Sequence, residues 1–474
     1  MPGVPSSKAC NACRKVKKKC DELQPCSRCL RRQLSCEGSG EQRYQFKSNQ
    51  LQRQRPRKKV TLANPSSRIP QTSCNRLAAW FVNTLDIKDI RFDVSIFGSF
   101  LKDLPQRLGE SLVLDAATQA LVSLYPFLRG LYRREVPRDV LMLYGKSLRA
   151  LRESLDDPVE VRSPYTLCSV YLISICQGWL GRNEKQSVSH ARAIAHLLRV
   201  VDLRKCNGGF ERQLIVTLSV PVILEEICNP RIRMAPNFWE DVMALIQQGS
   251  PEPDDRIPRF TTTLLSLSKF PEYLHHPYAH RAEIIAVYSQ LREDAQKIHP
   301  YLNEPTEPAG LSSPVVWHGS RYRAAYTVLI TLALLLNAPL RAVDSDSAIL
   351  AKEAVFFCER IVHEADVASR YRPLGAAFAV PCLVVALAAA DDPQQQACIE
   401  ATLADYQTDY GEVDWRKLAM WLRAVYHNYR GETALIPTDM DVSALKVPGS
   451  CCVMSLQAIF GLCLRLDYKR TQAL

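Results

Sequence analysis

The chain has 474 residues, of which 47% are hydrophobic and 23% are charged. These values are ordinary for soluble proteins, so most of the length can bury a core and a wholly disordered chain is excluded. Residues 1–60 contain 16 Lys and Arg against 4 Asp and Glu, whereas the whole chain has a net charge of +11. The positive charge is therefore concentrated at the N-terminal end, and the remaining residues nearly balance.

Six of the 17 cysteines fall between residues 10 and 36, and the others are scattered through apolar stretches. The first ten residues, MPGVPSSKAC, contain no apolar segment of a secretory signal. This indicates a reducing compartment, the cytosol or the nucleus, where clustered cysteines more often bind metal than form disulfides. We therefore expect a metal site in this segment.

The six clustered cysteines form the pattern C-x2-C-x6-C twice, with five residues between the two halves. Tetrahedral Zn²⁺ takes four ligands, so two separate ions would need eight. Six thiolates can serve two ions only if two sulfurs bridge them. One zinc with two idle cysteines is the alternative, and the symmetry of the halves disfavours it. The metal should supply most of the folding free energy of so small a segment. The candidate ligands are Cys10, Cys13, Cys20, Cys26, Cys29 and Cys36.

Basic residues fill most of the space between the cysteines. Five of the six positions from 14 to 19 are Lys or Arg, and Arg28, Arg31 and Arg32 lie in the second half. This density favours contact with nucleic-acid phosphates over an ordinary solvated face. Residues 10–36 contain no aromatic side chain that could stack on RNA bases. Double-stranded DNA is the favoured partner, and a thiol-rich metal sensor or an RNA-binding zinc protein are the alternatives.

The rest of the chain predicts a polar linker followed by a large all-α body. Residues 37–75 are rich in Gln, Arg, Ser and Pro, and apolar residues at helical spacing begin near Asn75. One predicted helix ends at Asp156-Asp157-Pro158, and Ser163-Pro164 opens the next. The uncharged stretches 163–181, 324–340 and 373–390 are expected to be buried core helices rather than membrane spans.

An enzyme in the body is disfavoured, and we expect no catalytic and no cofactor-binding residues there. Gly145-Lys146-Ser147 lacks the upstream glycine of a phosphate-binding loop. His275, His276 and His280 have no further ligand at metal-site spacing. Aromatic residues near the end of the body fit a helical core better than a ligand cage; they are Trp415, Trp421 and Tyr426.

The run from Cys13 to Asp21, followed by Pro25-Cys26-Ser27-Arg28-Cys29, resembles the six-cysteine binuclear zinc cluster transcription factors of fungi. The resemblance implies two short helices around two Zn²⁺ ions, with Cys10 and Cys26 as bridging ligands. Pro25 would turn the chain between the two halves. A fold of this kind would be a two-zinc DNA-binding module joined by a flexible linker to an all-α regulatory domain.

The same resemblance assigns roles to the basic residues. The first helix would enter the major groove, where Lys17 would read a CGG triplet and Arg14 would contact phosphate. Val16 stands where the family usually has a basic residue, so a phosphate contact is expected to shift by one position to Lys15. The predicted DNA-contacting residues are Arg14, Lys15, Lys17, Lys18, Lys19 and Arg28.

The body also resembles, more weakly, regulators encoded beside fungal secondary-metabolite gene clusters, through Tyr144-Gly145-Lys146 and the stretch from Ile175 to Gly181. This implies a nuclear regulator of RNA polymerase II transcription that acts with the transcription machinery. The basic residues of the run 53–59 predict a nuclear import signal.

We assign residues 1–40 to the zinc module, 41–75 to the linker and 76–474 to the regulatory domain. No heptad order is present in 37–75, so any homodimer should form through the helical body, and no membrane association is expected.

Overall fold

A computed structural model of the chain separates into two compact units, Met1–Ser67 and Arg68–Leu474. Each unit is described by itself. The described residues are 9–36, 72–86, 89–130, 136–180, 190–201, 203, 206, 208–229, 232–247, 261–302, 313–343, 348–409 and 415–429. Most of the predicted linker, including the basic run 53–59, lies outside them, as do the C-terminal residues 430–474.

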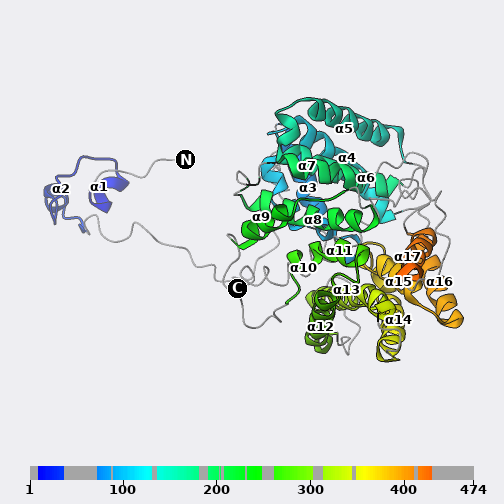
Figure 1. Cartoon of the computed structure of the whole chain (residues 1–474). Coiled ribbons are helices and arrows are strands. Elements are labelled where there is room, and N and C mark those ends of the chain that lie inside the picture. The colour runs from blue at the N-terminus through cyan, green and yellow to red at the C-terminus, as the bar shows by residue number, and fades with distance from the viewer. Residues whose placement is uncertain are drawn as a thin grey trace. The chain divides into compact units, whose positions relative to one another are not determined.

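The N-terminal unit contains two short helices, α1 (Asn11–Lys15) and α2 (Ser27–Arg31), labelled in Figure 1. Each helix follows the first cysteine of one half of the repeated motif. Cys26 is the N-cap of α2, and its side chain accepts a hydrogen bond from the backbone N–H of Cys29. The pair of short helices implied by the sequence resemblance is therefore present.

Helices make up the second unit, and its described residues include no β-strand. The first group of α-helices is α3 (Ser73–Leu85), α4 (Leu112–Gly130), α5 (Arg138–Asp156), α6 (Pro164–Leu180), α7 (His190–Val200), α8 (Gly209–Cys228), α9 (Pro236–Gln247), α10 (Leu264–Ser268) and α11 (Phe270–His275). The second group is α12 (Arg281–Ile298), α13 (Pro314–Val343), α14 (Ala348–Ala368), α15 (Ala379–Ala389), α16 (Pro393–Gln407) and α17 (Trp415–Tyr429). Short 3₁₀ turns connect several of them: η2 (Ile90–Phe92), η3 (Val94–Phe97), η4 (Ser99–Lys102), η5 (Leu104–Arg107), η6 (Glu160–Arg162), η9 (His299–Tyr301) and η10 (Ser369–Tyr371). This confirms the all-α prediction for the described body.

A helix with a long uncharged stretch lies at the centre of each group. In the first group α6 packs against α4, α5 and α7, and every residue from Thr166 to Cys176 is buried. In the second group α13 packs against α12, α14 and α15, and residues 323–340 are all buried. Figure 1 shows α13 between α12 and α14. A helix buried on every side can be apolar all round, which explains the uncharged stretches in the sequence.

The helix α13 is also long and apolar enough to cross a membrane by length and composition alone. However, 83% of its most apolar window is buried inside the body. A core helix meets the same criteria, so the burial agrees with the expectation of a core helix rather than a span.

The Asp-Asp-Pro triplet occurs twice, once at the C-terminal end of a helix and once at the N-terminal end of another. At the end of α5, the Asp157 carboxylate accepts the N–H of Val159 at 2.7 Å. At the start of α16, Asp392 is the N-cap and accepts the N–H of Gln395 at 2.8 Å. One aspartate of each triplet therefore accepts a backbone N–H next to a helix terminus, Asp157 just after α5 and Asp392 at the start of α16.

Two buried carboxylates in the second group are hydrogen-bonded, one to arginines and the other to backbone N–H groups. Glu364 of α14 is almost completely buried and accepts hydrogen bonds from Arg323 of α13 and from Arg360, the latter at 2.5 Å. Asp294 of α12 is fully buried and accepts the backbone N–H groups of Thr261 and Thr262, each at 2.9 Å. Removing one partner of such a buried pair leaves an uncompensated charge, so these contacts fix how the helices pack.

The apolar residues of α5 are only partly covered. Leu151 is buried, whereas Leu148 and Leu155 are 40% and 39% exposed. Trp179 is likewise half-buried, and its ring lies 5.9 Å from Phe97 between centroids. By contrast, Trp415 and Tyr426 of α17 are buried in the core, as the helical spacing predicts.

Leu334 lies in the middle of α13 and is completely buried. The variant Leu334→Ala leaves a cavity, so we expect its free energy of unfolding to fall by about 2–5 kcal/mol. Chemical denaturation followed by circular dichroism measures this change. Met420 of α17 is 61% exposed and provides the control, since Met420→Ala should change stability by about 0.5 kcal/mol or less. An equal fall in the free energy of unfolding in both variants would contradict the central position of α13.

Candidate metal centre and nucleic-acid interface

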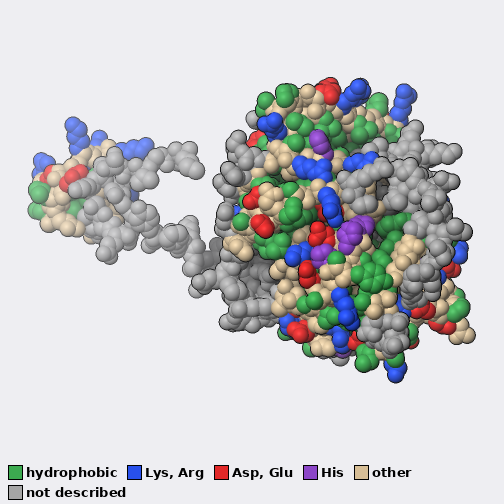
Figure 2. Space-filling view, in the orientation of Figure 1, with side chains coloured by type: hydrophobic (Ala, Val, Ile, Leu, Met, Phe, Trp, Pro, Cys, Tyr) green, Lys and Arg blue, Asp and Glu red, His purple; other side chains and the backbone are tan. Residues whose placement is uncertain are grey.

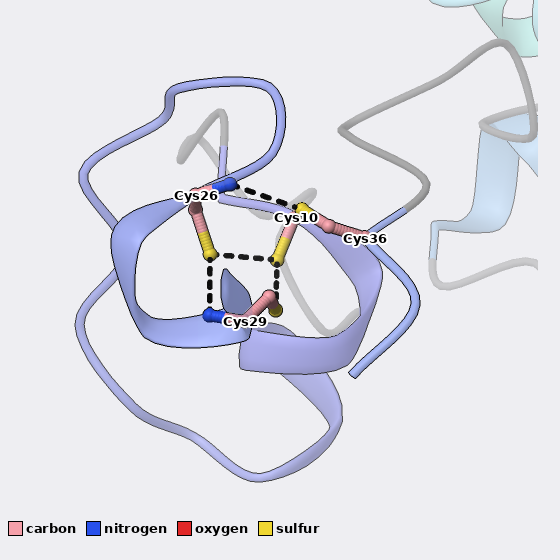
Figure 3. Close-up of side chains that lie close together, drawn as sticks. All are labelled: Cys10, Cys26, Cys29 and Cys36. Carbon is pink, nitrogen blue, oxygen red and sulfur yellow. Dashed lines mark hydrogen bonds between the residues drawn. The ribbon is translucent and has the colours of Figure 1, made fainter. Parts of the chain in front are cut away.

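The structure brings the six clustered cysteines together in two groups of four. One group is Cys10, Cys13, Cys20 and Cys26, and the other is Cys10, Cys26, Cys29 and Cys36. Within each group all sulfur atoms lie within 4.8 Å of one another. Figure 3 shows the second group, with the sulfurs of Cys10 and Cys26 side by side. Both groups contain Cys10 and Cys26, which therefore occupy the shared positions.

The spacing of the sulfurs fits zinc. Cys10 Sγ lies 3.7 Å from Cys26 Sγ and 3.7 Å from Cys29 Sγ, and Cys13 Sγ also lies 3.7 Å from Cys26 Sγ. Four sulfurs arranged tetrahedrally around Zn²⁺ at a Zn–S distance of about 2.3 Å lie about 3.8 Å apart. These four cysteines are almost completely buried, so the donor atoms are shielded from solvent. The residues present thus suit a thiolate-bound metal.

Equivalent backbone hydrogen bonds orient the sulfurs in the two halves of the motif. The N–H of Cys10 donates to Cys20 Sγ at 3.4 Å, and the N–H of Cys26 donates to Cys36 Sγ at 3.3 Å. Each shared cysteine also accepts the N–H of the cysteine three residues later, at 3.5 Å for Cys10 and 3.4 Å for Cys26. The two halves of the motif, sixteen residues apart in the sequence, therefore have the same local structure.

Both helices also end in the same way. Lys17 follows α1 with φ 51°, and Gln33 follows α2 with φ 48°. The N–H of the next residue then donates back to a cysteine carbonyl: Lys18 to Cys13 at 3.0 Å, and Leu34 to Cys29 at 2.9 Å. This is the Schellman arrangement, which satisfies carbonyls left free at a helix end. It turns the chain sharply after only five helical residues, so the residues that follow run in a different direction from the helix.

The basic residues of the first half lie on the surface of the N-terminal unit. Lys15, Lys17, Lys18 and Lys19 are all exposed, so their ammonium groups are free to meet a partner. Figure 2 shows Lys and Arg side chains projecting from this unit. The side chain of Arg14 lies outside the described part of the structure.

Arg28 has a second role that its position in the sequence did not reveal. Its guanidinium lies against the metal-binding cysteines, with Nη1 3.6 Å from Cys13 Sγ. This hydrogen bond lowers the pKa of Cys13 to about 7, because the cation favours the thiolate. Arg28 belongs to the second half of the motif and Cys13 to the first, so the contact joins the two halves.

Asp21 is another residue that the sequence reasoning did not single out. Its carboxylate accepts the backbone N–H of Ser27 at 2.9 Å and the hydroxyl of the same residue. These hydrogen bonds lower the pKa of Asp21, the hydroxyl contributing most. A carboxylate at a helix N-terminus is favourable, so Asp21 fixes the start of α2 after the cis peptide bond between Gln24 and Pro25. An acidic residue six positions before a short helix gives no signal in the sequence.

In the described body, the residues considered as alternative sites serve structural contacts. His275 Nε2 lies 3.4 Å from the carbonyl of Glu226, and His280 lies 3.4 Å from Glu283. Outside the two cysteine groups, the described residues contain no further cluster of three or more ligands within metal-binding distance.

Residues 8–45 match the sequence model of the fungal Zn(2)-Cys(6) binuclear cluster domain. The chain carries a zinc cluster domain of this family. Zinc cluster domains bind zinc and DNA, and the match indicates a fungal zinc cluster DNA-binding transcription regulator. The family is one of transcription factors, which are typically nuclear, and not of enzymes. Comparisons with curated proteins and with solved structures give no match. The similarity of the body to secondary-metabolite regulators stays a prediction.

The contact between Arg28 and Cys13 predicts that Arg28 supports metal retention in the zinc cluster domain. Residues that hydrogen-bond to metal ligands typically contribute about 10–100-fold in metal affinity. We expect Arg28→Gln in the full chain to lose zinc to a competing chelator at a correspondingly lower chelator concentration. Arg31 is exposed on the same helix and its guanidinium contacts the carbonyl of Ser27, so Arg31→Gln is the matched control. Identical zinc retention in the two variants would show that the contact between Arg28 and Cys13 does not strengthen metal binding.

Proposed function

We propose that the protein is a nuclear regulator of RNA polymerase II transcription that binds CGG-containing DNA through a cluster of two zinc ions. We further propose that it controls a biosynthetic gene cluster, in keeping with the sequence of its body. The observation that carries the proposal is the pair of four-sulfur groups sharing Cys10 and Cys26, beside a turn of exposed lysines.

Two ions held by six thiolates satisfy the preference of Zn²⁺ for four ligands only through two bridging sulfurs. Cys10 and Cys26 are the residues common to both groups, so we assign them this role. The remaining ligands are Cys13 and Cys20 on one ion, and Cys29 and Cys36 on the other. Zinc bound here would fix the relative positions of α1 and α2. Six thiolates with two Zn²⁺ carry about −2 together, so the N-terminal region stays strongly cationic.

The lysine turn after α1 suits base recognition. A helix entering the major groove presents the residues at its end to the base edges, and a lysine ammonium donates to the O6 and N7 acceptors of guanine. Lys17 lies at the turn itself, with Lys18 and Lys19 next to it, and all three are exposed. We assign triplet reading to Lys17 with help from Lys18 or Lys19. Lys15, and Arg14 by its place in the sequence, would contact phosphate.

The body would regulate the module without binding DNA itself. Residues 61–474 have almost no net charge, so they produce no field that attracts nucleic acid. Contacts with the transcription machinery and formation of a homodimer are assigned to this helical unit. Nuclear import is assigned to the basic residues of the run 53–59.

Replacing Lys17 tests the base-reading assignment. We expect Lys17→Ala in the full chain to weaken binding to a CGG duplex by about 1–3 kcal/mol and to reduce discrimination against a scrambled duplex. Electrophoretic mobility shift on both duplexes measures this difference. Lys15→Ala should weaken both duplexes alike, because a phosphate contact carries no sequence information.

Gln33 offers a matched control for Lys17, because it occupies the equivalent turn with a similar backbone conformation and no charge. Gln33→Ala should leave triplet discrimination unchanged. If Lys17→Ala still distinguished the CGG duplex from the scrambled duplex as well as the wild type does, the role of Lys17 would be overturned. Tighter binding to single-stranded RNA of the same sequence would instead favour the RNA-binding alternative.

The bridging assignment predicts unequal effects of cysteine substitutions. Cys10→Ser alters the coordination of both ions, whereas Cys20→Ser alters only one. We expect native mass spectrometry to find no zinc on most Cys10→Ser molecules and one or two ions on most Cys20→Ser molecules. Cys398 is exposed in the body and far along the chain, so Cys398→Ser should keep the wild-type zinc content. Equal zinc loss from the Cys10 and Cys20 variants would contradict the bridging role.

A further inference from the structure

A small cavity lies at the C-terminal end of α15, where α13, α16 and α17 meet it. Its volume is about 120 Å³. Arg341 comes from α13, Arg423 and Tyr426 come from α17, and Ala388 to Ala390 form the adjoining wall. Holding one water takes only roughly 10–15 Å³, so the cavity has room for several waters or one small organic molecule. The helices α15, α16 and α17 are grouped together in Figure 1.

Part of this arrangement caps α15. The last carbonyls of a helix have no partner within the helix, and cations are favourable beside them. Arg423 donates to the carbonyl of Leu387, and to the carbonyls of Ala388 at 3.4 Å and Ala390 at 3.0 Å. Arg341 Nη2 lies 3.4 Å from the carbonyl of Ala389. Capping therefore explains why two guanidinium groups meet here.

Two hydrogen-bond donors at the cavity are not used by this capping. The Nε of Arg341 and the hydroxyl of Tyr426 are buried, and neither has a hydrogen-bond partner among the residues that the structure describes. The Arg341 side chain is 9% exposed, and Tyr426 is 6% exposed. A buried donor without a partner is unfavourable, so two of them on one cavity indicate a missing acceptor. Burial also raises the pKa of Tyr426 well above its usual value, so its hydroxyl keeps the proton that it would donate.

The charges at the cavity favour an anion. Arg341 pairs with the exposed Asp391 at 2.7 Å, whereas Arg423 makes its hydrogen bonds with carbonyls and forms no ion pair with a described carboxylate. Burial lowers the pKa of Arg423, although the charges of Asp391 and Glu400 act in the opposite direction. The Arg and Asp residues that line the cavity are Arg341, Arg423 and Asp391, and their charges therefore sum to +1.

We propose that this cavity binds a small organic monocarboxylate. The carboxylate would accept hydrogen bonds from Arg341 Nε and the Tyr426 hydroxyl, close to the guanidinium of Arg423. Its short hydrocarbon part would lie against Ala388 to Ala390. Carboxylates are well matched to guanidinium donors, and a single negative charge balances the site.

Thermal unfolding of the zinc-loaded full chain tests the proposal, with butyrate as the probe and butyramide as its uncharged analogue at constant ionic strength. A ligand that binds only the folded protein raises the melting temperature. We expect a saturable rise of a few degrees with butyrate and none with butyramide. No saturable rise with butyrate or with benzoate would overturn the proposal. If the melting temperature rose with inorganic phosphate and not with butyrate or benzoate, the assignment of a carboxylate ligand would be overturned.

Tyr426→Phe removes only the unpartnered hydroxyl. We expect it to leave the melting temperature without ligand unchanged or higher, and to abolish the butyrate shift. Tyr406 is the matched control, because its hydroxyl donates to the carbonyl of Ala365 at 2.6 Å in the core. Tyr406→Phe should lower the melting temperature without ligand yet keep the shift.

Arg341→Lys removes Nε while keeping the charge, and should also abolish the shift. A butyrate shift of wild-type size in both Tyr426→Phe and Arg341→Lys would overturn the site. A clear loss of stability in ligand-free Tyr426→Phe would also count against it, since it would mean that ordered water already satisfies the hydroxyl.

Discussion

Thiolate coordination is the constraint on which the N-terminal unit depends, because residues 9–36 have almost no other interior. Their buried apolar cluster consists of Cys10, Cys13, Cys26 and Cys29. The larger hydrophobic side chains of the segment are exposed by 49–62%: Val16, Leu23, Leu30 and Leu34. Isolated helices of five residues are unstable in water. Metal bound by the sulfurs would therefore supply the free energy that apolar packing supplies elsewhere.

The same constraint leaves the surface of the module free for recognition. Since the sulfurs occupy the interior, Lys15 and the three lysines after α1 need not take part in packing, and all four are exposed. Arg28 contributes both to the positive charge and, through its contact with Cys13, to the cohesion of the two halves. The body is built in the opposite way, around helices with long uncharged stretches such as α6 and α13. Each unit thus has its own source of stability.

Much of this organisation could be predicted from the sequence, because it follows from local patterns. The repeated cysteine spacing predicted one cluster of six sulfurs, and uncharged stretches predicted the buried helices. Contacts between distant residues were not predictable. Nothing in the sequence links Arg28 to Cys13, or Asp21 to Ser27. Tyr426 was predicted as a core aromatic, and it is one, but the lack of a partner for its hydroxyl depends on how three helices meet.

Hydrogen exchange of the full chain before and after zinc removal by a chelator tests the central claim most directly. Peptides from residues 9–36 and from α6 are compared in one sample. If thiolate coordination folds the module, chelation should remove amide protection in 9–36 and leave the protection of Thr166 to Cys176 unchanged. Amides of α1 and α2 that stayed protected without zinc would contradict the account, because another interaction would then hold the module together.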